Sequence, residues 1–156
     1  MDRVTSDKYP KETSHPEVPK RRWMQAVLAL LLFVAGASIY LLFRSRQLLG
    51  FRLADAMGMG TTVDAWRDNV SHLHPSEFVL YSLPDGFWTC SYLLLIDLTL
   101  RHERPTRRFL WASVIPVLGI GSELLQFMHL CPGTFDPWDL ACYTTPLILY
   151  YIILKP

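Results

Sequence analysis

Four long apolar runs, separated by polar segments, follow the first 22 residues of the chain. The first run, from Trp23 to Phe43, is almost unbroken Leu, Ala, Val and Phe and carries no charge. A helix needs about 20 apolar residues to cross the hydrocarbon core of a bilayer. The other runs cover about 84–100, 109–130 and 137–154. The pattern therefore predicts an all-α, polytopic integral membrane protein, built as a bundle of four transmembrane helices.

A cleaved signal peptide is an alternative reading of the first run. Three basic residues, 20–22, precede it, and the small residues 35–37 resemble a cleavage site. Apolar residues continue beyond these small residues to Phe43. This length favours an uncleaved membrane anchor.

Prolines mark the expected helix boundaries and bends. Pro84 suits a first helical position, where its missing N–H costs nothing, so the second span is expected to begin there. Residues 78–83 would then approach it along the membrane surface. Pro116 and Pro146 lie inside the third and fourth runs. Each frees a backbone carbonyl that a neighbouring helix must satisfy, so both helices are expected to be bent and packed against protein.

The segments outside the runs have two characters. Residues 1–22 are polar, contain three prolines and show no periodic apolar face, which predicts a disordered cytoplasmic tail. In the first connection, Val63, Trp66, Val70 and Leu73 recur at helical spacing among polar residues. This pattern predicts a short amphipathic interfacial helix in the first outer loop, lying on the membrane surface.

Basic residues set the expected orientation. They gather before the first run, between the second and third, and after the fourth: Lys20, Arg21, Arg22, Arg101, Arg104, Arg107, Arg108 and Lys155. Cytoplasmic segments carry an excess of Lys and Arg, so both termini are expected in the cytoplasm. Arg44 and Arg46, directly after the first run, oppose this assignment.

Composition supports a membrane class and excludes others. The chain is 51% apolar and only 19% charged, against roughly 25% charged in an average soluble domain. With a net charge of +1 and scattered basic residues, it has no concentrated basic face for nucleic acid. Three cysteines without a CxxC pair indicate neither a disulfide framework nor a zinc ribbon. The sequence carries no catalytic signature and predicts no cofactor and no metal site.

Polar residues of three predicted spans converge on the outer leaflet. They are Asp85, Glu123, Gln126, Asp136 and Asp139. Burying one Asp in hydrocarbon costs roughly 2.5 to 3.5 kcal/mol on the insertion scale, so each acid needs a partner or a function. These five residues are the candidate ligand-binding site.

Structural roles compete with binding for some of these acids. Asp136 can cap the fourth helix, with Asp139 returning a bond to the cap as in a capping box. Asp85 gains from the positive end of its own helix. Glu123 has no Lys or Arg three or four residues away, so it must be protonated, paired across helices or solvated.

Other polar residues of the spans have simpler expected roles. Asp97 has Arg101 four residues later, which predicts an ordinary helical ion pair and no site role. Tyr143, Tyr150 and Tyr151 are expected in an aromatic belt at the membrane interface.

Part of the chain resembles the VanZ-like family of small bacterial membrane proteins. The similarity lies in Glu123-Leu124-Leu125-Gln126, the turn Pro132-Gly133-Thr134, and Asp136-Pro137-Trp138-Asp139. Leu83-Pro84-Asp85-Gly86 would open the preceding partner helix. The resemblance implies a location in the bacterial inner membrane and a cell-envelope role, linked by analogy to glycopeptide resistance. Thr134 stands where the family commonly has an arginine, which removes a natural anion contact.

Three functions are compatible with these residues. The first is a non-enzymatic protein whose acidic outer pocket binds a polar envelope ligand, such as a lipid-linked sugar, or a lipid headgroup. The second is a membrane-embedded enzyme acting on lipid or glycan headgroups through paired carboxylates. The third, a proton- or cation-coupled transporter formed by oligomerisation, is the weakest, because acids at one end make a poor relay. Membrane lipids are the expected partners in every case.

Overall fold

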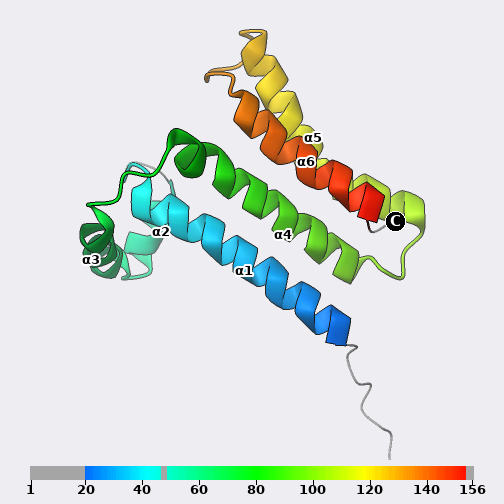
Figure 1. Cartoon of the computed structure of the whole chain (residues 1–156), viewed down its shortest axis with the longest axis horizontal. Helices are drawn as coiled ribbons and strands as arrows, with labels where there is room; N and C mark the ends of the chain where they lie inside the picture. Colours follow the sequence, from blue (N-terminus) through cyan, green and yellow to red (C-terminus); the bar gives the residue numbers. More distant parts are fainter. Residues whose placement is uncertain (1–19, 47–48, 154–156) are drawn as a thin grey trace, which may run out of the picture.

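The computed structural model describes residues 20–46 and 49–153, which form helices and connecting loops (Figure 1). The helices are α1 Lys20–Phe43, α2 Leu49–Ala56, α3 Gly60–Val70, the π-helical turn η1 Phe78–Ser82, α4 Leu83–Thr99, α5 Pro105–Phe127 and α6 Pro137–Ile153. Most of the predicted tail, 1–19, lies outside the described residues, as do 154–156. Residues 20–22 form the first turn of α1 and do not belong to a tail.

Three helical stretches of the described residues are long and apolar enough to cross a membrane: Lys20–Phe43, Phe78–Thr99 and Pro105–Phe127. The chain is therefore an all-helical membrane protein. The fourth helix, α6, has 17 residues. At 1.5 Å per residue it is about 25 Å long, shorter than the roughly 30 Å hydrocarbon core. A fourth span thus remains a prediction.

The second span begins earlier than the proline pattern predicted. Helical structure starts at Phe78 and continues through Pro84 without a break. The N–H of Leu83 donates to the carbonyl of Phe78, five residues back. A proline ring normally clashes with the carbonyl four residues before it, and a π-turn widens the backbone where that clash would occur. Residues 78–83 are therefore part of the span and not a separate approach to it.

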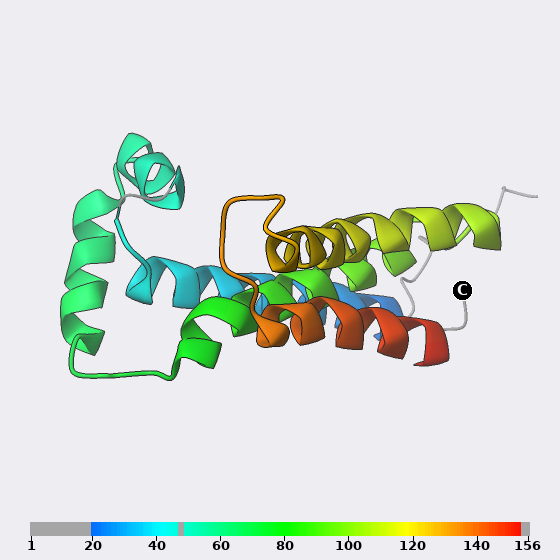
Figure 2. The ribbon, with the colours of Figure 1, turned by 90° about the horizontal axis from the view of Figure 1, so that it is seen from above.

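Helix α4 is the centre of the bundle and packs against α1, α5 and α6 (Figures 1 and 2). Its contact with α1 is close because Ala29 and Gly36 of α1 are small and buried. A Cβ atom on Gly36 would lie 2.7 Å from Nε1 of Trp88. The Ser91 hydroxyl donates to the Ala29 carbonyl at 2.8 Å. Small residues and interhelical hydrogen bonds of this kind are typical of helix packing in membranes.

Both internal prolines occur where their helices face protein. Pro116 is buried in α5. Pro146 removes the hydrogen bond to the carbonyl of Cys142, and Gly86 of α4 packs directly against Cys142, where an added Cβ would lie 3.3 Å from its sulfur. Both helices continue through their prolines and pack against a neighbour, as expected, while the expected bends remain a prediction.

The third run ends at Phe127, three residues before the predicted boundary. His129 adopts φ 58° and ends the helix. Its N–H donates to the Gln126 carbonyl, and the N–H of Leu130 donates to the Leu125 carbonyl. This is a Schellman motif with histidine in the left-handed position usually taken by glycine.

Helices α2 and α3 form a small unit beyond the end of α1, next to the start of α4 (Figures 1 and 2). Val63 of α3 is buried against Phe51 and Ala54 of α2. The predicted amphipathic helix therefore exists, but its buried residue packs on protein, while Trp66 is half exposed. Its location on a membrane surface remains a prediction.

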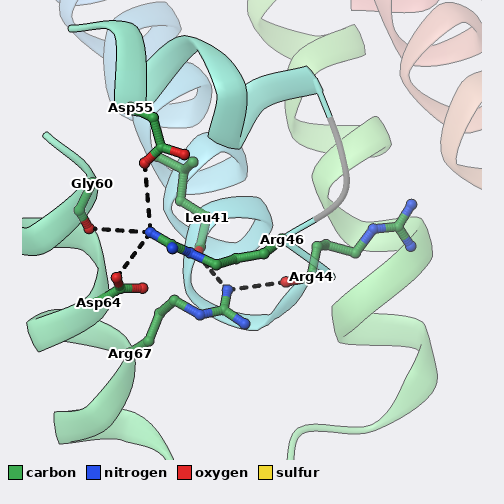
Figure 3. A network of polar contacts seen from close by, with 7 residues as sticks. All are labelled: Leu41, Arg44, Arg46, Asp55, Gly60, Asp64 and Arg67. Atoms are coloured by element: carbon green, nitrogen blue, oxygen red, sulfur yellow. Dashed lines mark hydrogen bonds and ion pairs between the residues drawn. The ribbon is translucent and has the colours of Figure 1, made fainter. Parts of the chain in front are cut away.

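Arginines attach this unit to α1, as Figure 3 shows. Nη1 of Arg67 donates to the carbonyls of Leu41 at 2.8 Å and Arg44 at 2.9 Å. It thereby satisfies carbonyls at the C-terminal end of α1, where a positive charge is favourable. Arg46 pairs with Asp64 at 2.9 Å, and both side chains are largely exposed, so this pair contributes little to stability.

Candidate functional site at the acidic end of the bundle

Four carboxylates from three helices lie together at one end of the bundle, which we call the acidic end: Asp85, Glu123, Asp136 and Asp139. Asp85 lies in the first turn of α4, Glu123 in the last part of α5, and Asp139 in the first turn of α6. The negative charge of Asp139 acts on both Asp85 and Glu123, and that of Asp136 acts on Glu123. The structure therefore brings these four predicted residues into one cluster. Their role in ligand binding remains a prediction.

Glu123 is the most deeply buried acid of the cluster, with 6% of its surface exposed. Its Oε2 accepts a hydrogen bond from the backbone N–H of Asp136 at 3.1 Å. In a capping box, Asp139 would accept this bond instead. The expected capping box is therefore replaced by a contact between α5 and the start of α6. Asp136 does cap α6, because its Oδ1 accepts the N–H of Trp138 at 2.8 Å.

Asp139 has an unsatisfied hydrogen-bond acceptor. Its Oδ1 is buried and has no hydrogen-bond partner within residues 20–46 and 49–153. A buried polar atom without a partner costs about 1–3 kcal/mol. Asp139 also lies close enough to Asp85 and Glu123 for its charge to act on both.

Asp85 is held by a tyrosine that the sequence did not reveal as part of the site. The Tyr143 hydroxyl of α6 lies close enough to the Asp85 carboxylate to interact with it. Tyr143 is therefore not a belt residue at a lipid interface as expected. Its position four residues after Asp139 on the same helix face was the available signal.

Gly119 of α5 allows this tyrosine to enter the bundle. A Cβ atom on Gly119 would lie 2.6 Å from Cδ1 of the Tyr143 ring. Gly119 thus contacts α6, and Glu123 on the same helix bonds to Asp136 just before α6. Residues that contact substrate or ligand need such support from packed neighbours.

One positive charge acts on Asp85, and it comes from the end of α1. The positive charge of Arg44 interacts with Asp85. The guanidinium carbon of Arg44 lies 4.6 Å from the centre of the Tyr81 ring, a cation–π contact. Arg44 thus supplies a positive charge near Asp85.

Gln126, the fifth predicted site residue, contacts its own helix and the α5–α6 turn. Its amide donates to the Ser122 hydroxyl at 3.4 Å and forms no hydrogen bond with an acid in the described part of the chain. Gly133 in the α5–α6 turn has φ 133°, and a Cβ there would lie 2.8 Å from Cδ of Gln126. Gln126 therefore lies against the turn rather than inside the cluster.

A cavity of about 430 Å³ extends from Asp85 and Tyr143 along α4. Side chains of α1, α4, α5 and α6 line it: Phe33, Asp85, Trp88, Thr89, Ser91, Tyr92, Leu95, Ile115 and Tyr143. Its volume lies within the roughly 300–1,000 Å³ typical of ligand pockets. Its wall is polar near the acidic end and mainly apolar elsewhere.

A metal site needs several ligating side chains close together. Within residues 20–46 and 49–153, no three His, Cys, Asp or Glu side chains lie close enough together to hold a metal ion.

The opposite end of the bundle contains a second buried carboxylate, Asp97 of α4. Its Oδ1 pairs with Arg108 of α5 at 3.1 Å, and its Oδ2 accepts a hydrogen bond from Gln25 of α1 at 3.2 Å. Tyr150 of α6 lies beside Arg108. The expected pair with Arg101 is therefore wrong, because Asp97 points into the bundle and finds its partners on other helices. We call this cluster the charge-paired end.

No family model, curated protein or solved structure matches the chain.

Proposed function

We propose that this membrane protein binds a polar envelope ligand or lipid headgroup at its acidic end, without catalysing a reaction. One observation carries the proposal: carboxylates from α4, α5 and the start of α6 share a site, and the one positive charge that acts on Asp85 there is that of Arg44. Buried acids in a membrane protein are costly, so a site of this kind is retained for a partner or a function.

The hydrogen-bonding state of the cluster supports a ligand with donor groups. Asp139 has a buried oxygen without a partner in the described part of the chain, and Asp85 has only the Tyr143 hydroxyl and the charge of Arg44. Carboxylates accept hydrogen bonds, so hydroxyl or ammonium groups complement them. A sugar moiety or a lipid headgroup provides such donors.

The proposal includes a VanZ-like role in the bacterial cell envelope, with the protein in the inner membrane and both termini in the cytoplasm. The resemblance of the Glu-x-x-Gln, Pro-Gly and Asp-x-x-Asp segments supports this assignment. Under this topology the acidic end faces the outer leaflet, where envelope components are exposed.

The test measures which envelope lipids remain bound to the purified full chain. Wild type, Glu123→Gln and Asp139→Asn are purified in mild detergent, and retained lipids are quantified by mass spectrometry. Both substitutions preserve side-chain size and remove one negative charge. We expect each to lose most of the retained polar lipid, while Asp68→Asn, which removes an exposed carboxylate from α3, retains it. Equal retention by all four proteins would exclude the proposed site.

A further inference from the structure

The cavity beside α4 has the shape and polarity of a site for an amphiphile. Its lining follows α4 from Asp85 to Leu95, ten residues, which is about 15 Å at the helical rise. Asp85 and Tyr143 lie at one end, whereas Phe33, Leu95 and Ile115 supply apolar surface further along. A ligand that fills it must therefore carry a polar group and an extended apolar part.

The polar part of the cavity has more hydrogen-bonding capacity than the protein uses. Thr89 lines the cavity and is only 1% exposed, and its hydroxyl oxygen has no hydrogen-bond partner within the described ranges. Native structures pair nearly all such groups, and exceptions call for an explanation. Ser91, by contrast, is bonded to α1, and Trp88 Nε1 donates to the Phe33 carbonyl at 3.3 Å.

Charge indicates the class of headgroup. Asp85 interacts with the charges of Asp139 and Glu123 at the same end of the cavity, and these acids outnumber the one basic group, Arg44. An anionic headgroup would be repelled by this arrangement. An ammonium group would be attracted, and its three donors match carboxylate and hydroxyl oxygens.

We propose that the ligand is a phospholipid with an ammonium headgroup, bound with the headgroup at Asp85 and Tyr143 and one acyl chain in the cavity between α1, α4 and α5. The inference rests on the proposed function and specifies its ligand. The phosphate of this lipid lies towards Arg44, so both charges of a zwitterionic headgroup have a complement.

The experiment offers the full chain two phospholipids that differ only in their headgroup. Detergent-purified protein is incubated with an equimolar mixture of dioleoyl phosphatidylethanolamine and dioleoyl phosphatidylglycerol, and bound lipid is measured by native mass spectrometry. We expect the ethanolamine lipid to be enriched about tenfold, the ratio that 1.4 kcal/mol of discrimination produces. Asp85→Asn is expected to reduce the enrichment to near unity.

A second pair of variants tests the acyl site. Ile115→Trp places a large side chain in the cavity and is expected to reduce the binding of both lipids. Ile148→Trp adds the same side chain at an exposed position of α6 and is expected to leave binding unchanged. Leu95→Trp replaces Ile115→Trp if that variant does not fold.

The outcomes separate the inference from the proposed function. Equal binding of the two lipids, or no effect of Ile115→Trp and Leu95→Trp, overturns the inference. If Glu123→Gln and Asp139→Asn still lose envelope lipids in that case, the acidic site remains valid with another ligand. If these variants also retain all lipids, both proposals fail.

Discussion

The two ends of the bundle treat buried carboxylates in opposite ways. At the charge-paired end, Asp97 has an arginine at 3.1 Å and an amide at 3.2 Å, each from a different helix. At the acidic end, Asp85, Glu123 and Asp139 repel one another, and Arg44 acts from outside the cluster. The first arrangement pairs its carboxylate with a positive charge and an amide, although Nε of Arg108 and the Tyr150 hydroxyl have no hydrogen-bond partner within the described ranges. In the second, two negative charges and one positive charge act on Asp85, and Oδ1 of Asp139 has no partner there.

This difference separates a structural role from a binding role. An ion pair that joins α4 to α5, with Gln25 of α1 on the same carboxylate, fixes how the helices assemble. At the acidic end, Glu123 bonds to the start of α6 and Asp136 caps that helix, but the like charges of the acids oppose assembly. Acids placed together in this way call for a partner or a function. Substitutions at the two ends should therefore differ in sign and size.

The largest effect is expected from Arg108→Met. Loss of one partner of a buried ion pair leaves the other charge uncompensated and destabilises a protein by about 3–5 kcal/mol. Both side chains are mostly buried, with 15% and 12% exposed, so solvent screens the pair weakly. Unfolding by denaturing detergent in mixed micelles measures the loss.

Glu103→Gln is the matched control for this prediction. It breaks the exposed pair of Glu103 with Arg107 and should cost roughly 0.3–0.5 kcal/mol. Equal losses of stability in the two variants would show that the buried pair of Asp97 and Arg108 stabilises the bundle no more than an exposed ion pair does.

A smaller loss is expected from Gly119→Ala. The new Cβ would lie 2.6 Å from the Tyr143 ring, so the ring must move and the interaction of its hydroxyl with Asp85 must weaken. Overpacking of this kind costs about 1–3 kcal/mol. The same unfolding assay, combined with the lipid-retention measurement, reports both consequences.

Gly121→Ala provides the comparison on the same helix. A Cβ on Gly121 meets nothing within 4 Å, and alanine favours helix by about 1 kcal/mol relative to glycine. This variant should be as stable as wild type or more stable. A loss as large as that of Gly119→Ala would show that the contact with Tyr143 is not the cause.

Arg67→Met tests how firmly the α2–α3 unit is attached near the acidic end. Removing Arg67 leaves the carbonyls of Leu41 and Arg44 without this donor, at a cost of about 1 kcal/mol or less because water can replace it. We expect limited proteolysis to cut the α2–α3 unit faster. An unchanged cleavage rate would mean that other contacts, such as the packing of Leu41 of α1 against Phe51, Ala54 and Val63, hold the unit without Arg67.

The sequence predicted the elements of the fold better than their partners. Apolar length identified α1 and α5 closely, because a membrane helix must satisfy its backbone internally and so follows the apolar run. The start of the second span at Phe78 could not be predicted from the sequence, because a helix can continue through a proline when a π-turn precedes it. Only the tertiary backbone shows that turn.

Contacts within the site were harder to predict. The shared end of Asp85, Glu123 and Asp139 follows from antiparallel helices alone, so the sequence was sufficient for it. The rotation of each helix about its axis could not be predicted from the sequence. This rotation decides that Asp97 contacts Arg108 rather than Arg101, and that Gly119 contacts Tyr143. Neutral residues such as Tyr143 carry no charge pattern that would identify them as site residues.

The most direct test compares Asp97→Asn with Asp139→Asn in the same lipid-free unfolding assay. The account predicts that Asp97→Asn destabilises the protein, because Arg108 loses its carboxylate, while Asp139→Asn leaves stability within about 0.5 kcal/mol of wild type or raises it. A loss for Asp139→Asn as large as that for Asp97→Asn would contradict the claim that the acidic end is built for a ligand rather than for folding.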